Sequence, residues 1–411
     1  LGGGDDLSLP VGTLAVNPDL LGPGRKHLDG APPVPRNSPT VFNVGLWDSG
    51  LFWDSRVESL GKEAGQNGAG SGIRTPDSSF GVADTNAGSN LVAAQARFPV
   101  TSADEMKTTS FEDGSSNDVI RHHLAARIGN YAEGTGELAS TTWVSEFQQA
   151  FDSTEGAEQL VTFDNIALAL GEYERSMVFI NNPWKDYVEG NNDALSEQQK
   201  QGAILFFTSV DDGGAGCSSC HSGDQFTDGL HHVVAFPQIG MGKGDGNNDD
   251  FGRARETGDN NERYHFRTAS LLNISATAPY SHSGAYATLR QVVRHYDNPR
   301  ARVDDFFADG GWCQLQQFLS TDNCETLYPD AQNNSNLALQ QLNREQNNNS
   351  SLFENAQINN NETDQIVAFL EVLTDPCVED RECLEPWIAD PSLSGPDGMQ
   401  LNAVGEDGDL L

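Results

Sequence analysis

The stretch AGCSSCHSGDQ, residues 215–225, decides how this chain is interpreted. Cys217 and Cys220 are separated by two residues, and His221 follows at once. This is the attachment pattern of c-type haem, in which both sulfurs form thioethers and the histidine ligates the iron. The alternative is a redox-active or zinc-binding Cys-x-x-Cys pair that is followed by a histidine by chance. Because the sequence holds no second pair of that kind to complete a zinc site, the motif predicts one covalently held haem c.

The segments that flank the motif are expected to form the helices of a cytochrome c domain. Residues 194–207, ALSEQQKQGAILFF, start with a Ser-x-x-Gln capping box at Ser196 and continue as an amphipathic helix towards the motif. Residues 362–374, ETDQIVAFLEVLT, supply a closing amphipathic helix. We place a domain boundary near Asn192, so that residues 1–192 form an N-terminal domain and residues 193–411 a C-terminal cytochrome c domain.

The remaining segments predict a mainly α fold with long loops. Residues 1–100 are rich in Gly, Pro, Asn and Asp and are expected to form loops. Residues 164–180 predict a core helix that is capped by Asp164. Its expected buried positions are Ile166, Leu170, Tyr173 and Met177. Residues 299–361 are Asn- and Gln-rich and are expected to form an insertion in the C-terminal domain.

The net charge of the chain limits the classes of molecule that are expected to bind to it. The chain has 60 Asp and Glu residues against 24 Lys and Arg residues, a net charge of -36. Nucleic acids and anionic membranes would be repelled, so neither is an expected partner. Such a charge suits a saline medium, in which counterions screen self-repulsion, and a marine or halophilic bacterial source is expected. The sequence also holds no apolar run of roughly 18 residues, so no membrane span is predicted.

The other cysteines point to an oxidising compartment. Covalent attachment of c-type haem in bacteria takes place outside the cytoplasm, and the first residue is Leu1 rather than Met, so we expect a periplasmic or otherwise exported protein. Four cysteines lie outside the haem motif, and nearest-neighbour pairing predicts disulfides between Cys313 and Cys324 and between Cys377 and Cys383. A metal site would need tighter spacing or nearby histidines.

Three separated blocks carry a resemblance to a known family. They are residues 36–60 (RNSPTVFNVGLWDSGLFWDSRVESL), residues 100–106 (VTSADEM) and residues 266–296 (FRTASLLNISATAPYSHSGAYATLRQVVRHY). In this order they resemble the bacterial di-haem cytochrome c peroxidases and MauG-type enzymes. The resemblance implies two cytochrome c-like haem domains with a calcium site between them.

The same resemblance implies the ligands of the visible haem. His221 would be the proximal ligand, and the distal ligand would stand fourteen residues after His282, at Tyr296. Peroxidases of the family have Met at this position and MauG-type members have Tyr, so the chain is similar to the latter. A hard, anionic phenolate favours oxidised iron, whereas a thioether raises the potential. His295 and Met241 compete for the distal position.

Further roles are implied residue by residue. Glu105 matches the carboxylate beside the peroxide-binding haem, where it would move a proton during O–O cleavage. Trp53 matches the tryptophan between the two haems, and His282 would lie in the haem surroundings. Asn37, Thr277 and Pro279 match positions that bind calcium through oxygen atoms. Residues 245–256 are expected to be a surface loop, with Arg253 and Arg255 as partners of haem propionates.

The resemblance implies a haem oxidoreductase with one departure from the family. Hydrogen peroxide would be reduced at an N-terminal haem, and oxidising equivalents would pass to the second haem and on to a redox protein or a protein substrate. The chain, however, has no CxxCH motif upstream of Arg36. An electron-transfer cytochrome with one haem, or a haem-storage subunit of a larger assembly, is therefore the alternative. A homodimer is a further expectation.

Overall fold

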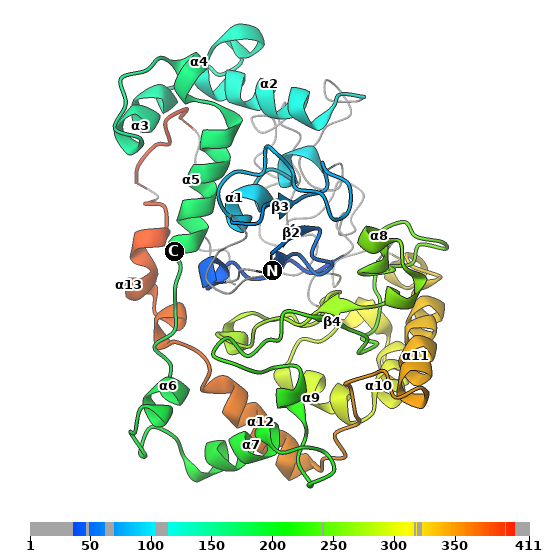
Figure 1. Cartoon of the computed structure of the whole chain (residues 1–411). Helices are drawn as coiled ribbons and strands as arrows, with labels where there is room; N and C mark the ends of the chain where they lie inside the picture. The colour runs from blue at the N-terminus through cyan, green and yellow to red at the C-terminus, as the bar shows by residue number, and fades with distance from the viewer. Residues whose placement is uncertain are drawn as a thin grey trace.

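The computed structural model describes residues 36–46, 49–61, 70–102, 114–240, 242–315, 318, 323–390 and 392–398. The fold is mainly helical, and two small antiparallel sheets lie between groups of helices (Figure 1). The first sheet pairs Gly50 with Glu58 and Glu58 with Arg74, and the second pairs His231 with Arg267. The strands are β1 (Gly50–Leu51), β2 (Val57–Ser59), β3 (Ile73–Arg74), β4 (His231–His232) and β5 (Phe266–Arg267).

Most of the helices before residue 180 lie on the other side of these sheets from those after it, whereas α13 lies beside α5 (Figure 1). Those before residue 180 are α1 (Leu91–Gln95), α2 (Asn117–Gly129), α3 (Trp143–Ala150), α4 (Ala157–Leu160) and α5 (Phe163–Ser176). Those after it are α6 (Pro183–Val188), α7 (Glu197–Phe207), α8 (Ala254–Thr257), α9 (Leu289–Asp297), α10 (Pro299–Ala308), α11 (Ala331–Asn347), α12 (Asn360–Glu371) and α13 (Arg381–Leu384). Part of the core of the second group lies where α7 crosses α12, with Phe206 and Phe369 almost fully buried.

The capping box predicted for α7 is confirmed. Ser196 accepts a hydrogen bond from the backbone of Gln199, whose side chain accepts one from the Ser196 backbone. Gly202 lies at the crossing with α12, where a Cβ would come within 1.9 Å of the Gln365 carbonyl oxygen. Glycine therefore sets how closely the two helices approach, and this approach fixes the start of the segment that leads to Cys217.

The prediction for residues 164–180 is wrong in three respects. The helix α5 ends at Ser176 and is capped by Thr162, with Asp164 in its first turn. Leu170 and Tyr173 are 45% and 47% exposed instead of buried. The buried residues of α5 are Phe163, Ala167 and Gly171. The helix packs against α1 through Gly171, where a Cβ would lie 2.8 Å from the Ala93 nitrogen.

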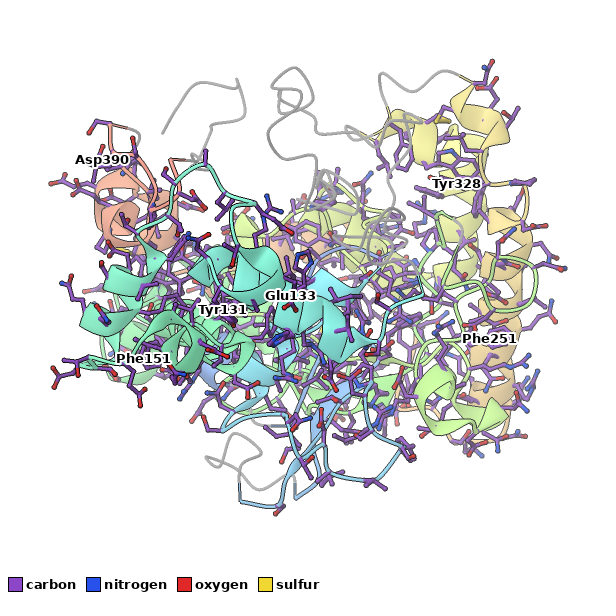
Figure 2. The ribbon with its side chains drawn as sticks, turned by 90° about the horizontal axis from the view of Figure 1, so that it is seen from above. Tyr131, Glu133, Phe151, Phe251, Tyr328 and Asp390 are labelled. Atoms are coloured by element: carbon purple, nitrogen blue, oxygen red, sulfur yellow. A yellow bond between two sulfur atoms is a disulfide. The ribbon has the colours of Figure 1, made fainter. Side chains whose placement is uncertain are left out.

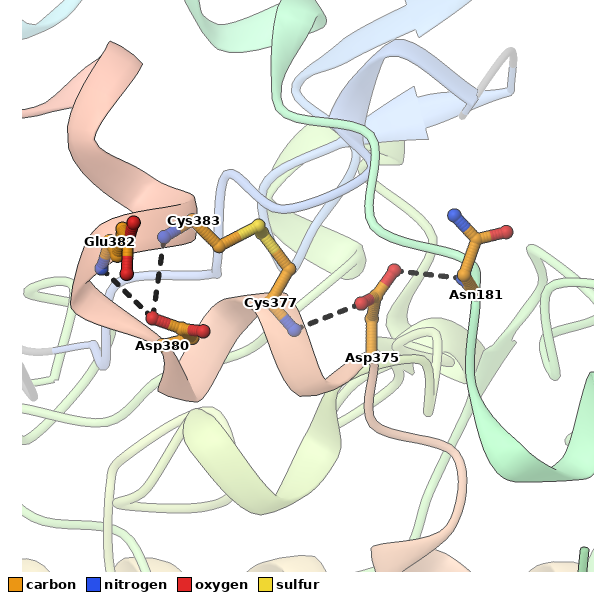
Figure 3. The surroundings of a disulfide bond; sticks show 6 residues. All are labelled: Asn181, Asp375, Cys377, Asp380, Glu382 and Cys383. Carbon is orange, nitrogen blue, oxygen red and sulfur yellow. Dashed lines mark hydrogen bonds between the residues drawn. A yellow bond between two sulfur atoms is a disulfide. The ribbon is translucent and has the colours of Figure 1, made fainter.

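Both predicted disulfides are confirmed, Cys313 with Cys324 and Cys377 with Cys383. The second closes a short turn whose ends are fixed by carboxylates: Asp380 accepts hydrogen bonds from the backbone of Glu382 and Cys383, and Asp375 from Asn181 and Cys377 (Figure 3). The segment that follows the turn packs back onto the N-terminal helices.

Residues of this last segment form hydrogen bonds with α5 and α3. Figure 1 shows α13 beside α5. The Tyr173 hydroxyl donates to the Trp387 carbonyl over 2.7 Å. The Trp143 indole donates to Asp397 over 3.2 Å. The described end of the chain therefore contacts helices of the proposed N-terminal domain, and the division at Asn192 stays a prediction.

A buried ion-pair network joins the first sheet to residues 245–256. Arg36 donates two hydrogen bonds to Asp250, over 2.6 and 2.7 Å, and one to Asp54 over 2.6 Å. Asp249 and Asp250 are each 3% exposed, so the interpretation of residues 245–256 as a surface loop is wrong for these positions. The physical reason is this long-range pairing, in which two carboxylates and a guanidinium compensate one another away from water.

Candidate haem site

One cavity brings together most of the residues that the sequence singled out. Its lining includes Cys217, Cys220, His221, Tyr296, His282, Trp53, Asn37, Thr277 and Pro279. The surface of the cavity is mostly apolar, with Phe206, Leu289, Val293 and Leu370 among its walls. Residues that lie up to 259 positions apart in the sequence, from Asn37 to Tyr296, therefore meet at one place.

The haem motif begins on a short 3-10 turn, Cys217–Ser219, which is joined to the end of α7 by residues 208–216. Ala215 donates its backbone hydrogen bond back to Leu205, and the His221 backbone donates to Cys217 over 2.9 Å. The Nδ1 atom of His221 lies 3.1 Å from the Phe226 carbonyl oxygen, which fixes the plane of the imidazole ring. Burial lowers the pKa of His221 and raises that of the Cys217 thiol to about 12. A neutral imidazole is the form in which histidine ligates iron.

The donor set fits a c-type haem. Cys217 and Cys220 are the two cysteines that form no disulfide, while the other four are paired. Their sulfurs and the His221 ring face an apolar cavity with Tyr296 also in its wall. Two thiols, an imidazole and a phenol around an apolar space match the ligands and the surroundings that a covalently attached porphyrin requires.

Hydrogen bonds distinguish the two candidate distal ligands on α9, Tyr296 and His295. Both nitrogens of His295 are engaged: Nε2 lies 2.9 Å from the Val234 carbonyl oxygen and Nδ1 lies 3.0 Å from the Tyr286 hydroxyl. The ring also stacks on Phe236 with 4.3 Å between centroids. His295 is therefore a core residue, and burial lowers its pKa to about 4. Met241 lies outside the described residues.

The surroundings of the Tyr296 side chain differ from those of His295. No hydrogen bond is formed by its hydroxyl within the described part of the chain, and burial followed by the charges of Cys220 and Cys217 raises its pKa. Both thiols are thus close enough to act electrostatically on the phenol. The side chain of Tyr296, unlike that of His295, is left with a polar atom facing the haem motif across the cavity.

The residues matched to calcium binding also converge in this cavity. The Asn37 amide lies 2.7 Å from the Pro279 carbonyl oxygen and 3.3 Å from that of Ser281. Thr277 lines the cavity beside them. The amide nitrogen and oxygen of an asparagine exchange places on a flip, and the flipped amide would turn its oxygen towards these carbonyls. A hard cation prefers such a group of oxygen atoms.

Trp53 and His282 complete the same wall. The Trp53 indole donates to the Asn37 carbonyl over 2.7 Å, and the Asn37 backbone donates to the His282 carbonyl over 2.8 Å. The His282 ring stacks on Phe266 with 3.7 Å between centroids, and burial lowers its pKa to about 4. Its Nε2 atom is buried and has no hydrogen-bond partner among the described residues. A polar atom of this kind at a cavity wall needs a ligand or water as its partner.

Comparisons with known proteins show which proteins the chain resembles. Residues 17–193 match the family model of the di-haem cytochrome c peroxidases. The cytochrome c551 peroxidase of Pseudomonas aeruginosa is 30% identical over 63% of this chain and 57% of its own length. The methylamine utilization protein MauG of Methylorubrum extorquens is 27% identical over 65% of this chain and 56% of its own length.

The chain is similar to the di-haem cytochrome c peroxidases and to the MauG proteins. It spans little more than half the length of these two curated relatives. The crystal structure of a MauG-like protein associated with microbial copper homeostasis superposes with a TM-score of 0.50 at 21% identity, covering 87% of this chain and 79% of that one. This likeness shows a common fold.

The geometry does not agree with the role expected for two arginines from the chemistry of their guanidinium groups. Arg253 is buried and donates to the Glu58 carboxylate over 2.7 Å and to the Asp54 carbonyl over 2.8 Å. Arg255 donates to Asp245 over 2.6 Å. Neither lines the haem cavity, so the structure does not support their prediction as propionate partners: each guanidinium is already matched by a carboxylate elsewhere. Glu105, the expected catalytic carboxylate, lies outside the described residues.

Sequence reasoning missed two cavity residues. Arg267 lines the cavity, donates through Nε to the Phe52 carbonyl over 3.0 Å, and has its pKa lowered to about 10 by burial. His232 pairs with Asp228 over 2.7 Å, and both lie close to the Cys220 sulfur. The Arg267 signal was available, because the residue belongs to the matched block 266–296. His232 could have been found from its i, i+4 spacing to Asp228 after the haem motif.

Proposed function

We propose that the protein is a haem peroxidase of the di-haem peroxidase and MauG type, with a c-type haem attached to Cys217 and Cys220 and ligated by His221 and Tyr296. The observation that carries the proposal is the meeting of these four residues around one apolar cavity, while His295 is held by the protein on both nitrogens. When bound, the haem supplies reversible one-electron chemistry at its iron.

The chain's own residues have distinct tasks in this proposal. The Phe226 carbonyl orients His221, and the apolar walls exclude water from the site. The Tyr296 phenol would lose its proton and present an oxygen to the iron. Trp53, fixed through its indole N–H to Asn37, would relay electrons or holes between this cavity and the N-terminal part of the chain. Glu105 would move the proton between the two oxygens of hydrogen peroxide.

Calcium would stand between the N-terminal segment and the second haem domain, held by oxygens of Asn37, Thr277 and Pro279. The reductant would be a redox protein, or a protein substrate whose residues are oxidised, as the Tyr ligand of MauG-type members favours. We place the protein in the periplasm or another exported compartment. Two confirmed disulfides support this location, because such bonds persist in oxidising compartments. No helix in the described part of the chain has both the length and the apolar character needed to cross a membrane.

The distal ligand can be tested on the holoprotein with a matched tyrosine. Tyr296→Phe is expected to remove the phenolate signature from the optical and EPR spectra. Tyr286→Phe removes a buried hydroxyl whose hydrogen bond, within the described residues, is to His295, and it should leave those spectra unchanged. Identical spectra for Tyr296→Phe and the parent protein would contradict the assignment.

The peroxidase assignment has a separate test. A pyridine haemochrome assay with intact mass gives the haem count, and spectra before and after hydrogen peroxide show whether one haem is high-spin and reactive. Replacing Glu105 by Gln should lower the peroxidase kcat by about 10²-fold or more. A single six-coordinate haem that does not respond to peroxide would favour the alternative, an electron-transfer cytochrome.

A further inference from the structure

A second, polar cleft lies on the Asn- and Gln-rich part of the chain, and it shares Tyr264 with the lining of the haem cavity. One wall is a face of α11 that carries Asn334, Leu337, Gln341 and Arg344 at helical spacing. The opposite wall belongs to residues 246–264. Figure 2 shows Phe251, which belongs to this wall, beside α11 and on the opposite side of the molecule from Tyr131 and Phe151. We call this space the α11 cleft.

The floor of the α11 cleft is fixed by satisfied hydrogen bonds. Asp249 is 3% exposed and accepts from the Tyr264 hydroxyl over 2.8 Å and from the Asp250 backbone over 2.8 Å. The Asn334 amide donates to the Asn247 and Asn248 carbonyls over 3.0 and 3.2 Å. Because these buried groups already have partners, the walls hold their positions and the cleft is preorganised.

Two guanidinium groups border the α11 cleft without a compensating carboxylate. Neither Arg263 nor Arg344 forms an ion pair within 4 Å among the residues that the structure describes. Arg263 lies over the Phe251 ring at 3.9 Å, and its Nε atom is buried without a hydrogen-bond partner there. Arg344 donates to the Gln341 side chain over 2.8 Å. Both guanidinium charges lie close enough to the Tyr264 phenol to act on it, and both arginines line the cleft.

This arrangement is unusual for so acidic a chain. With 60 acidic and 24 basic residues, a carboxylate partner for any one arginine is easily supplied, and Arg36, Arg121 and Arg253 each have one. Two arginines that face one preorganised cleft without such a partner keep their donors for an anion from outside the chain.

We propose that the α11 cleft binds a small organic anion of the hydroxycarboxylate class. Arg263 and Arg344 would hold the carboxylate, because guanidinium groups match its geometry. The side-chain amides of Asn and Gln along α11, which both donate and accept hydrogen bonds, suit the hydroxyl groups. Phe251 and Leu337 cover the apolar carbons of the ligand. Inorganic phosphate shares the anionic chemistry without needing the amides or the apolar contacts.

The test is a calorimetric titration of the holoprotein in about 0.15 M salt, where counterions screen the net charge beyond roughly 8 Å. The probes are malate, inorganic phosphate and the neutral polyol mannitol. We expect saturable binding of malate, weaker binding of phosphate and no binding of mannitol. Arg344→Gln and Arg263→Gln should each weaken malate binding about tenfold or more, since each removes charge-assisted hydrogen bonds.

Arg300→Gln is the matched control, because Arg300 is exposed on the neighbouring helix α10 and does not line the cleft. It should leave malate binding unchanged. Arg344 is itself exposed, so Arg344→Gln keeps the test decisive even if Arg263→Gln fails to fold. No heat with malate, tighter binding of phosphate than of malate, equal binding of mannitol, or the same loss in Arg300→Gln would each overturn the proposal. None of these outcomes depends on whether the protein is a peroxidase.

Discussion

Replacing Arg36 by Leu tests the buried network that joins Arg36 and Asp54 to Asp250. The substitution removes three charge-assisted hydrogen bonds, two to Asp250 and one to Asp54, and leaves two buried carboxylates without their main counter-charge. Breaking a buried pair in this way costs about 3–5 kcal/mol of unfolding free energy. Urea unfolding of the holoprotein at pH 7, followed by circular dichroism, measures this loss, and Arg300→Leu on the exposed side of α10 should change stability by less than about 0.5 kcal/mol.

The pH dependence of the loss follows from the two carboxyl groups. Burial alone would raise the pKa of Asp250 and of Asp54, but the charge of Arg36 and its hydrogen bonds lower both. In the parent protein their stabilisation is complete above the unfolded pKa of about 3.9 and is lost as the pH falls through the lower folded values. Without Arg36, burial raises both pKa values, so protonation removes the unpaired charges at mildly acid pH. The deficit of the variant should therefore shrink from pH 7 to pH 5; a deficit below about 1 kcal/mol, or one that grows on acidification, would refute this reasoning.

Three further variants test the packing, a disulfide and an ion pair of the fold. Gly202→Ala should destabilise the protein by about 2 kcal/mol in the same urea assay, because the new Cβ meets the Gln365 carbonyl oxygen on α12; a neutral effect would show that α7 and α12 can move apart. Replacing Cys377 and Cys383 together by Ser should cost about 2 kcal/mol under non-reducing conditions, as expected for a disulfide with a separation of six residues, and an unchanged midpoint would contradict this. Glu345→Gln should cost about 1 kcal/mol at neutral pH, since Glu345 accepts from His265 over 2.8 Å. Although burial raises the pKa of Glu345, the hydrogen bond from His265 lowers it overall, so its stabilisation is present above the unfolded pKa and is lost on acidification; a difference that persists at pH 3 would argue against the ion pair.

Local signals in the sequence predicted local structure well. The capping box at Ser196 and the two short-range disulfides depend on residues within 11 positions of one another, and all three are confirmed. The failure at α5 has a different origin. Periodicity indicates an apolar stripe along a helix. Which face of α5 becomes buried, however, depends on the helix that packs against it, and α1 can approach α5 only where Gly171 leaves room. Leu170 and Tyr173 are left on the exposed side.

The residues of the site also differ in how well they could be predicted from the sequence. The motif at Cys217 is local, and the family resemblance extended it to Tyr296 and Asn37, which the structure places in one cavity. Arg253 could not be assigned from sequence, because its partner Glu58 lies 195 positions away and nothing local distinguishes a propionate from a buried carboxylate. The α11 cleft was likewise invisible, since its two arginines become neighbours only when α11 packs on residues 246–264.

The ion-pair network and the wall of the haem cavity form one continuous unit. Arg36 precedes Asn37, whose backbone donates to the His282 carbonyl, while the Asn37 carbonyl accepts from the Trp53 indole. The Trp53 carbonyl in turn accepts from the Arg267 backbone over 2.8 Å. A buried charge cluster does not by itself indicate high stability, because apolar residues of similar volume often stabilise a fold equally well. Its location beside the cavity wall suggests a positioning role: the paired charges hold Arg36 and Asp54 against Asp250, and so fix the adjacent Asn37 and Trp53 in the wall of the cavity.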